Sequence, residues 1–305
     1  MSYGLNASLA RSLSYWRAVL LGVGAFLLAS CGESSAGAQP QAQSPAPAEK
    51  AAASTADKPA TATEPSRVAS SHPVAIIVLG SSSPAGKNIY KLFNRPKAEE
   101  QEYADKYNWV ALYDAYLKSH DPENRAINLA AASKHSTSIA LNEKEGGPLY
   151  KNSLAYALKT YPGADAMIVN FPAIRVQEGE DVSGVVENLK EIERRALAAG
   201  VGKVWIATAQ PAANKTECAK ATSGACEPGS TIYDSRIKLT EAIIAAFPGR
   251  YLDFYTPLAK GGRANGVADP ELLNQIDKLH PNLKGHEALR DAVIKAGVYE
   301  AAAGK

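Results

Sequence analysis

The sequence has few of the residues that bind metals and almost no excess of charge of either sign. It contains five histidines and three cysteines in 305 residues, and its formal net charge is +2. The histidines and cysteines are too few and too scattered to predict a metal site, so we expect none. A nearly neutral chain also lacks the basic stripe that nucleic-acid-binding proteins use, so we expect no nucleic-acid partner.

Large apolar residues are almost missing from residues 31–72, which are rich in alanine, proline, serine and threonine. Such a segment cannot bury enough surface to offset the entropy lost on ordering. We therefore predict a disordered tether over 31–72 and a folded domain over 73–305. The sequence shows no internal repeat.

Residues 1–30 have the pattern of a targeting segment, with Arg11 and Arg17 ahead of the apolar run 18–29. That run is short for a permanent membrane span. It ends in "LASC", which resembles a bacterial lipobox and predicts a lipid on Cys31 after cleavage. An uncleaved anchor helix is the alternative. Either interpretation predicts an exported chain held at the lipid bilayer of the cell envelope. Gly32 indicates the periplasmic side of the outer membrane if the host is Gram-negative.

The two remaining cysteines, Cys218 and Cys226, lie in the polar stretch "ECAKATSGACEPG". Export would place them in an oxidising compartment. No cysteine or histidine pair stands nearby at the spacing of zinc ligands. We therefore expect Cys218 and Cys226 to form a disulfide that closes a short loop.

Apolar runs of strand length alternate with segments of helical periodicity from residue 73 onward. This alternation predicts an α/β fold of three layers, α/β/α, around a five-stranded parallel sheet. The expected strands are 74–79, 125–130, 164–171, 202–211 and 250–254, and the expected helices are 108–119, 153–161, 182–200, 231–247 and 282–297. Residues 92–107 form a charged insertion of unassigned structure.

Polar residues follow the first and the last of these strands. Ser82 lies in "GSSS" directly after the first strand, and "DKLHPN" places Asp277 and His280 shortly before the last helix. Open parallel sheets form their sites beyond the carboxyl ends of the strands, where these two loops can meet. A serine needs a base to take its proton, and a carboxylate can orient that base. The alternative is that Asp277 caps the last helix and that His280 is an ordinary polar residue of the loop.

With these motifs the chain resembles the SGNH, or GDSL-type, hydrolase family, as an exported lipoprotein member. The resemblance covers nearly all of 73–297 and includes "NWVALYDAYL", "INLA", "VNFP" and "RYLDFYTPLA" in the expected order. It implies the family's flavodoxin-like fold, with Ser82 as nucleophile, His280 as base and Asp277 as its partner. The opening block departs from the family, because Ser81 stands where an aspartate is usual.

The oxyanion hole implied by the resemblance is altered in this sequence. The backbone N–H of Ser82 would be one donor, and Ser133 takes the place of the family's glycine donor. Ile174 stands where the family has an asparagine. Arg175 beside it is a candidate substrate contact; the alternative is an ordinary surface arginine.

These expectations define a first hypothesis and two rivals. The first is a monomeric serine esterase that hydrolyses acyl or acetyl esters, as on envelope carbohydrate, through an acyl-enzyme, with no metal or organic cofactor. The second is a weakened module of the same fold that binds envelope glycans or lipids without turnover. The third is a purely structural lipoprotein.

Overall fold

The structure, a computed structural model, describes residues 72–132, 136–171, 176, 181–211, 231–263 and 267–304. All of these belong to one compact unit, Thr63–Lys305. Within them, no helix combines the length and the apolar character needed to cross a bilayer.

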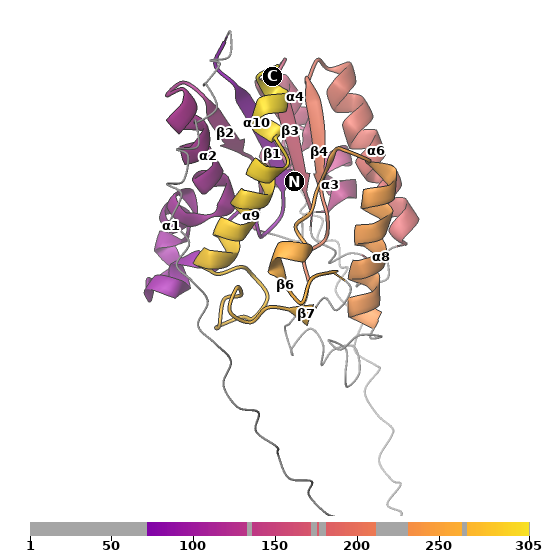
Figure 1. The fold of residues 1–305 in the computed structure, drawn as a ribbon. Coiled ribbons are helices and arrows are strands. Elements are labelled where there is room, and N and C mark those ends of the chain that lie inside the picture. Colours follow the sequence, from indigo (N-terminus) through magenta and orange to yellow (C-terminus); the bar gives the residue numbers. More distant parts are fainter. Residues whose placement is uncertain are drawn as a thin grey trace, which may run out of the picture. The chain divides into compact units, whose positions relative to one another are not determined.

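A parallel sheet forms the centre of this unit (Figure 1). Within the described part of the chain its strands are β1 (Ala75–Gly80), β2 (Arg125–Asn128), β3 (Ala166–Asn170), β4 (Lys203–Ala207) and β5 (Tyr251–Leu252). The strand order is β2-β1-β3-β4-β5, and every neighbouring pair is parallel. This is the doubly wound, flavodoxin-like order. The predicted three-layer fold with a five-stranded parallel sheet is therefore confirmed.

Helices cover both faces of the sheet (Figure 1). The α-helices are α1 (Glu100–Tyr107), α2 (Trp109–His120), α3 (Thr137–Asn142), α4 (Leu154–Thr160), α6 (Val182–Ala198), α8 (Thr231–Ala246), α9 (Leu283–Lys295) and α10 (Val298–Ala302). Short 3-10 helices are η1 (Ile89–Phe93), η2 (Lys97–Glu99), η3 (Tyr150–Asn152) and η4 (Thr256–Leu258). Two short strands, β6 (Ala259–Lys260) and β7 (Val267–Ala268), pair antiparallel beside the main sheet.

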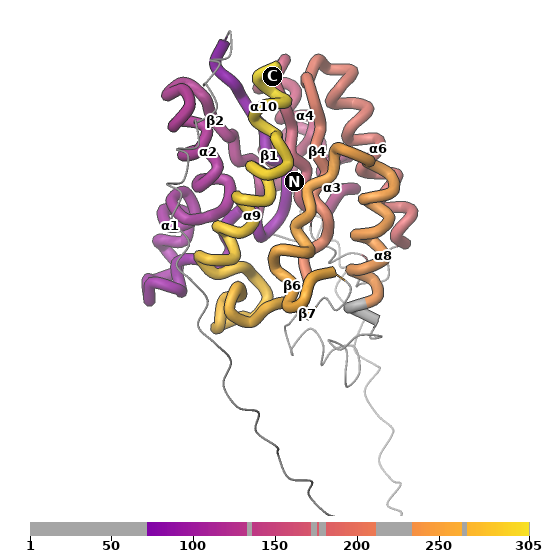
Figure 2. Tube along the Cα trace, in the orientation of Figure 1, coloured from indigo at the N-terminus to yellow at the C-terminus, as the bar shows by residue number. Residues whose placement is uncertain are grey.

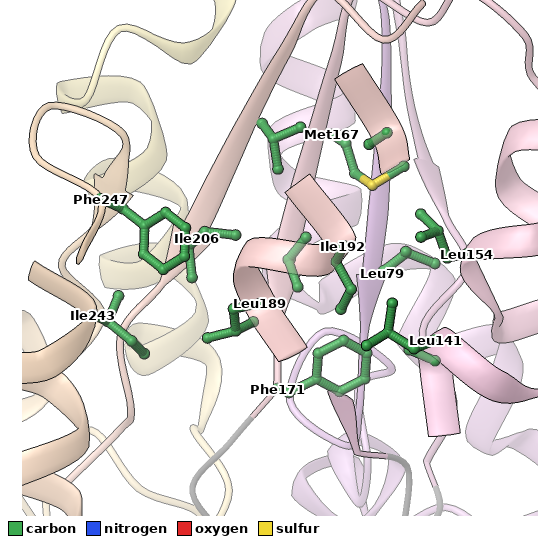
Figure 3. Packing of buried hydrophobic residues seen from close by; sticks show 14 of the residues in the cluster. Leu79, Leu141, Leu154, Met167, Phe171, Leu189, Ile192, Ile206, Ile243 and Phe247 are labelled. Atoms are coloured by element: carbon green, nitrogen blue, oxygen red, sulfur yellow. The ribbon is translucent and has the colours of Figure 1, made fainter. Parts of the chain in front are cut away.

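The central strands β1 and β3 are apolar up to their last residues, Gly80 and Asn170, as both of their faces are covered. In the β1–β3 register Ile76 pairs with Ala166 and Ile77 with Met167, so successive residues feed opposite faces. On one face, Met167 and Leu79 belong to one buried cluster with Ile192 and Leu189 of α6 (Figure 3). A parallel sheet buried on both faces requires this kind of continuous apolar run.

The opposite face is covered by helices from the two ends of the domain. Trp109 of α2 and Leu289 of α9 belong to one buried cluster with Ile76 and Ile168. Figure 2 shows the same arrangement, with the yellow helix α9 alongside the indigo strand β1. The first strand and the last long helix therefore lie together, which brings the two loops named above toward one edge of the sheet.

The charged insertion 92–107 forms regular structure, mainly η2 and α1. Ala104 is the one buried residue of α1, and it lies against Gly86 in the turn after β1. The insertion thus supports that turn.

Candidate active site

The turn that carries Ser82 starts where β1 and β3 approach each other closely. A Cβ on Gly80 would lie 2.4 Å from the Asn170 carbonyl oxygen and 2.5 Å from Cγ of Pro84, so only glycine fits there. The next N–H, that of Ser81, donates to the Asn170 carbonyl at 3.1 Å. Ser82 follows at the carboxyl end of β1 and is half-buried.

Backbone hydrogen bonds close this turn over residues 81–88. The N–H of Lys87 donates to the carbonyl of Ser82 at 3.0 Å, and the N–H of Gly86 donates to that of Ser83 at 3.0 Å. Gly86 has a φ of +70°, and a Cβ there would lie 2.7 Å from Cβ of Ala104. Glycine therefore meets both the conformational and the steric demand of the position.

Side chains at the end of β2 and beyond β4 hold the turn in place. Asn128, at the end of β2, donates through Nδ2 to the Pro84 carbonyl at 2.8 Å. Gln210, beyond β4, donates through Nε2 to the Ser83 hydroxyl at 2.8 Å. The nucleophile candidate thus lies on a braced turn rather than on a free loop.

The backbone N–H of Ser82 has no acceptor among the described residues, and neither has that of Ser83. Proline follows at position 84 and has no N–H to add. Two consecutive unpaired N–H groups beside a half-buried serine are able to donate to a developing oxyanion.

Asp277 and His280 form a hydrogen-bonded pair in the loop before α9. Oδ2 of Asp277 lies 3.0 Å from Nδ1 of His280, and Oδ1 accepts from the backbone N–H groups of Leu279 and His280, both at 3.0 Å. Because a carboxylate only accepts, Nδ1 carries the proton and Nε2 is left as the basic nitrogen. The side chain of His280 is 12% exposed, which leaves it accessible to a ligand.

The electrostatic environment keeps Asp277 ionised. Burial alone would raise the pKa of Asp277, but the hydrogen bond and charge of His280 and the two backbone N–H groups lower it to about 2. The N-cap of α9 is Asn282, whose Oδ1 accepts from the N–H of Gly285 at 3.0 Å. The alternative in which Asp277 caps the last helix is therefore wrong.

One side chain joins this pair to the turn of Ser82. Nδ2 of Asn88 donates to Oδ2 of Asp277 at 2.6 Å, across 189 positions of the chain. Nδ2 of Asn274 donates in turn to the Asn88 carbonyl at 3.2 Å. The structure thus brings Asp277 and His280 into direct contact and joins them, through Asn88, to the turn that carries Ser82. The Ser82 hydroxyl has no hydrogen bond within the described part of the chain.

His286 is buried behind the pair. Its Nδ1 accepts from the Trp109 N–H at 3.2 Å. Burial, together with the nearby His280, lowers the pKa of His286 to about 3, so it is neutral. His286 therefore packs α9 against α2, in line with its position one turn into the helix.

Several predicted residues lie outside the described residues: Ser133, Ile174, Arg175, Cys31, Cys218 and Cys226. Their roles stay predictions. For Ser133 the structure describes the approach, since the N–H of Ala131 donates to the carbonyl of Gly80 at 3.1 Å.

Sequence reasoning missed the polar residues that support the site, namely Asn88, Asn128, Gln210 and Asn274. Asn128 and Gln210 lie inside the predicted strands 125–130 and 202–211, and Asn88 and Asn274 lie in stretches with no predicted element, so no expectation pointed to any of the four side chains. An asparagine two residues after Gly86 is consistent with a turn, but nothing local indicates that its amide reaches Asp277.

Comparison with known proteins gives similarity in structure only. No family model and no curated protein matches the chain. TesA is 15% identical with a TM-score of 0.46, and the match covers 73% of this chain and 97% of TesA. The psychrotrophic esterase EstA from Pseudoalteromonas sp., in a structure inhibited by monoethylphosphonate, is 16% identical with a TM-score of 0.48, covering 74% and 97%. A member of the lipolytic protein G-D-S-L family from Veillonella parvula DSM 2008 is 15% identical with a TM-score of 0.44, covering 73% and 97%. Likeness at this level assigns neither family nor activity, so function has to come from the side chains of the site.

Proposed function

We propose that this chain is a serine hydrolase that cleaves esters, with Ser82 as nucleophile, His280 as base and Asp277 as the orienting carboxylate. The observation that supports this best is the Asp277–His280 pair, tied through Asn88 to the turn that carries Ser82. An ionised carboxylate that holds Nδ1–H leaves Nε2 free to take a proton, as the base of a serine hydrolase must.

The proposed reaction has two halves. Nε2 of His280 takes the Ser82 proton while Oγ attacks the ester carbonyl carbon, and the imidazolium then protonates the departing alkoxide to release the alcohol. A water molecule next gives its proton to Nε2 and attacks the acyl-enzyme, and the proton passes back to Oγ as the acid leaves. The unpaired N–H of Ser82 would stabilise the oxyanion in both halves.

The substrate class and location follow from the sequence and are part of the proposal. We propose acyl or acetyl esters, as carried by envelope carbohydrates, and a monomer attached to the bilayer through Cys31. Ser133 would add a second oxyanion donor, and Arg175 would contact substrate.

A fluorophosphonate probe tests this proposal, because it reacts with activated serines only. We expect the probe to label Ser82, and we expect Ser82→Ala to abolish both labelling and hydrolysis of a short-chain nitrophenyl ester. Ser81→Ala is the matched control, since the buried Ser81 hydroxyl has no partner among the described residues. Absence of labelling, together with equal trace activity in wild type and Ser82→Ala, would refute the enzyme.

One feature of the sequence favours a second candidate, a binding module without turnover. Ile174 stands where a side-chain oxyanion donor is expected, and loss of one such donor costs about 10²–10³ in rate. Saturable binding of an acetylated glycan by both wild type and Ser82→Ala, with no acetate released, would support this candidate.

A further inference from the structure

Asn88 occupies a backbone conformation that glycine would fill more easily. Its φ is 66° and its ψ is 6°, the left-handed region, at the N-cap position of η1. Asparagine tolerates this region, but the backbone alone gives no preference for it over glycine. Its side chain does not cap η1 either. The contact that distinguishes asparagine from glycine at this position is the one its side-chain amide makes with Asp277.

Both backbone polar groups of Asn88 are fixed by distant elements. Its N–H donates to Oε1 of Glu100 in α1 at 3.0 Å, and its carbonyl accepts from Asn274, which is fully buried. A residue held on both sides cannot easily redirect its side chain. The Asn88 amide is therefore preorganised toward Asp277.

Among the described residues, the Asp277 carboxylate accepts four hydrogen bonds, and Asn88 supplies the one that comes from outside its own loop. The amide shares Oδ2 with Nδ1 of His280, so it also influences the hydrogen bond that orients the base. Ser82 and Asn88 lie in one closed turn through the bond between Lys87 and Ser82. The hydrogen bond from Asn88 thereby sets the position of the Asp277–His280 pair relative to this turn.

We propose that Asn88 is a positioning residue that holds the Asp277–His280 pair in a fixed position relative to the turn that carries Ser82. This inference rests on the proposed function and adds a residue to its machinery. Asn88 contacts no substrate and acts only through Asp277.

The charged and titratable groups around this contact are few in the described residues. Glu100 binds the Asn88 N–H and is paired with Lys87 at 3.2 Å. His280 shares the carboxylate oxygen, and the neutral His286 lies beyond it. A new charge on the side chain of residue 88 would therefore act on Asp277 and His280, which its amide faces, and on the Glu100–Lys87 pair beside its backbone.

The first test replaces Asn88 by glycine, which keeps the left-handed backbone and removes the amide. The matched control is Asn94→Gly, because Asn94 has a φ of 54° at the other end of η1 and is exposed. We expect Asn88→Gly to slow fluorophosphonate labelling and to lower kcat by about 10–100-fold, with little change in KM, because small misplacements of reacting groups carry costs of this size. Asn94→Gly should remain within about twofold of wild type.

The second test places a carboxylate at the same position and does not depend on turnover. In Asn88→Asp a negative charge replaces the N–H donor that faces Oδ2 of Asp277 at 2.6 Å, so NMR should show the Asp277 carboxyl group titrating well above its wild-type pKa of about 2. Asn94→Asp should leave this titration unchanged, because position 94 is exposed. A purely structural role for Asn88 would change the melting temperature without moving the titration.

The outcomes separate the inference from the function on which it rests. If wild type is labelled at Ser82 but Asn88→Gly matches Asn94→Gly in rate, the function stands and the positioning role is overturned. If wild type is not labelled, the proposed function fails, and the NMR comparison alone decides the role. A titration moved by Asn88→Asp supports it, and equal titrations in the two aspartate variants reject it.

Discussion

Replacement of Asp277 by asparagine should nearly abolish activity while leaving the fold almost intact. Oδ1 of Asp277 accepts two backbone N–H groups, so the new carboxamide must place its oxygen there and its NH₂ at the position of Oδ2. That NH₂ then faces Nδ1 of His280 and Nδ2 of Asn88. Asn88 can answer by rotating its own amide, but the imidazole can answer only by changing tautomer.

The tautomer change determines how large a loss of kcat we expect. With Nδ1 unprotonated, the proton sits on Nε2, and Nε2 can no longer take the proton of Ser82. A base held in the wrong tautomer costs about 10⁴-fold in kcat in a serine hydrolase. The four hydrogen bonds survive as neutral bonds in place of charge-assisted ones, so the free energy of unfolding should fall by only about 1–2 kcal/mol.

Hydrolysis of a nitrophenyl ester and urea denaturation measure the two effects on one preparation. The informative result is a large loss of kcat combined with a small loss of stability. A variant that keeps more than a tenth of the wild-type kcat would show that Asp277 does not orient the base. A variant that fails to fold would contradict the expectation that the carboxamide keeps all four hydrogen bonds.

Two further predictions concern the frame of the site and its response to acid. Gly80→Ala should lower the free energy of unfolding by about 1–3 kcal/mol, because the new methyl group overpacks the site. The control is Gly184→Ala in α6, where a Cβ meets nothing within 4 Å, and this variant should be as stable as wild type or more stable. Equal urea midpoints for the two variants would contradict the close approach of β1 and β3. The pKa of Asp277 is lowered from 3.8 to about 2 in the folded state. The stability it contributes is therefore present above about pH 4 and is lost as the pH falls toward 2. Urea midpoints at pH 5 and pH 3 should differ less in Asp277→Asn than in wild type, and identical pH dependence would show that the carboxylate does not contribute.

The fold could be predicted because its elements carry their own patterns. Runs of branched apolar residues predicted β1 and β3. A helical period followed by Gly200 predicted α6, and the structure places this helix at Val182–Ala198. Gly200 has a φ of +89°, as a residue that ends a helix often has. Strand β4 was predicted to continue to residue 211 but ends at Ala207, because its partner β5 has only two residues and pairs no further than Ala207. Strands β6 and β7 are two residues each, too short for a periodic signal.

The site was predictable where its chemistry is local. A three-residue separation in a turn allows a carboxylate to fold back on an imidazole, and Asp277 and His280 do so. Asn88 was not predictable, because its contact depends on the packing of η1 and α1 against a loop from the other end of the domain. Long-range contacts made by single polar residues leave no periodicity in the sequence.

The proposed catalytic site combines residues from both ends of the folded domain, since α9 packs on the sheet face that includes β1. Within the described part of the chain, every strand of the main sheet precedes the loop that carries Asp277 and His280. A polypeptide truncated before residue 277 would therefore keep all five of these strands and lack both proposed catalytic side chains. Under the proposed mechanism, such a fragment should not hydrolyse esters. Under the proposed mechanism, the hydroxyl of Ser82 would therefore gain its base only after the loop before α9 has been synthesised and α9 has packed against the sheet.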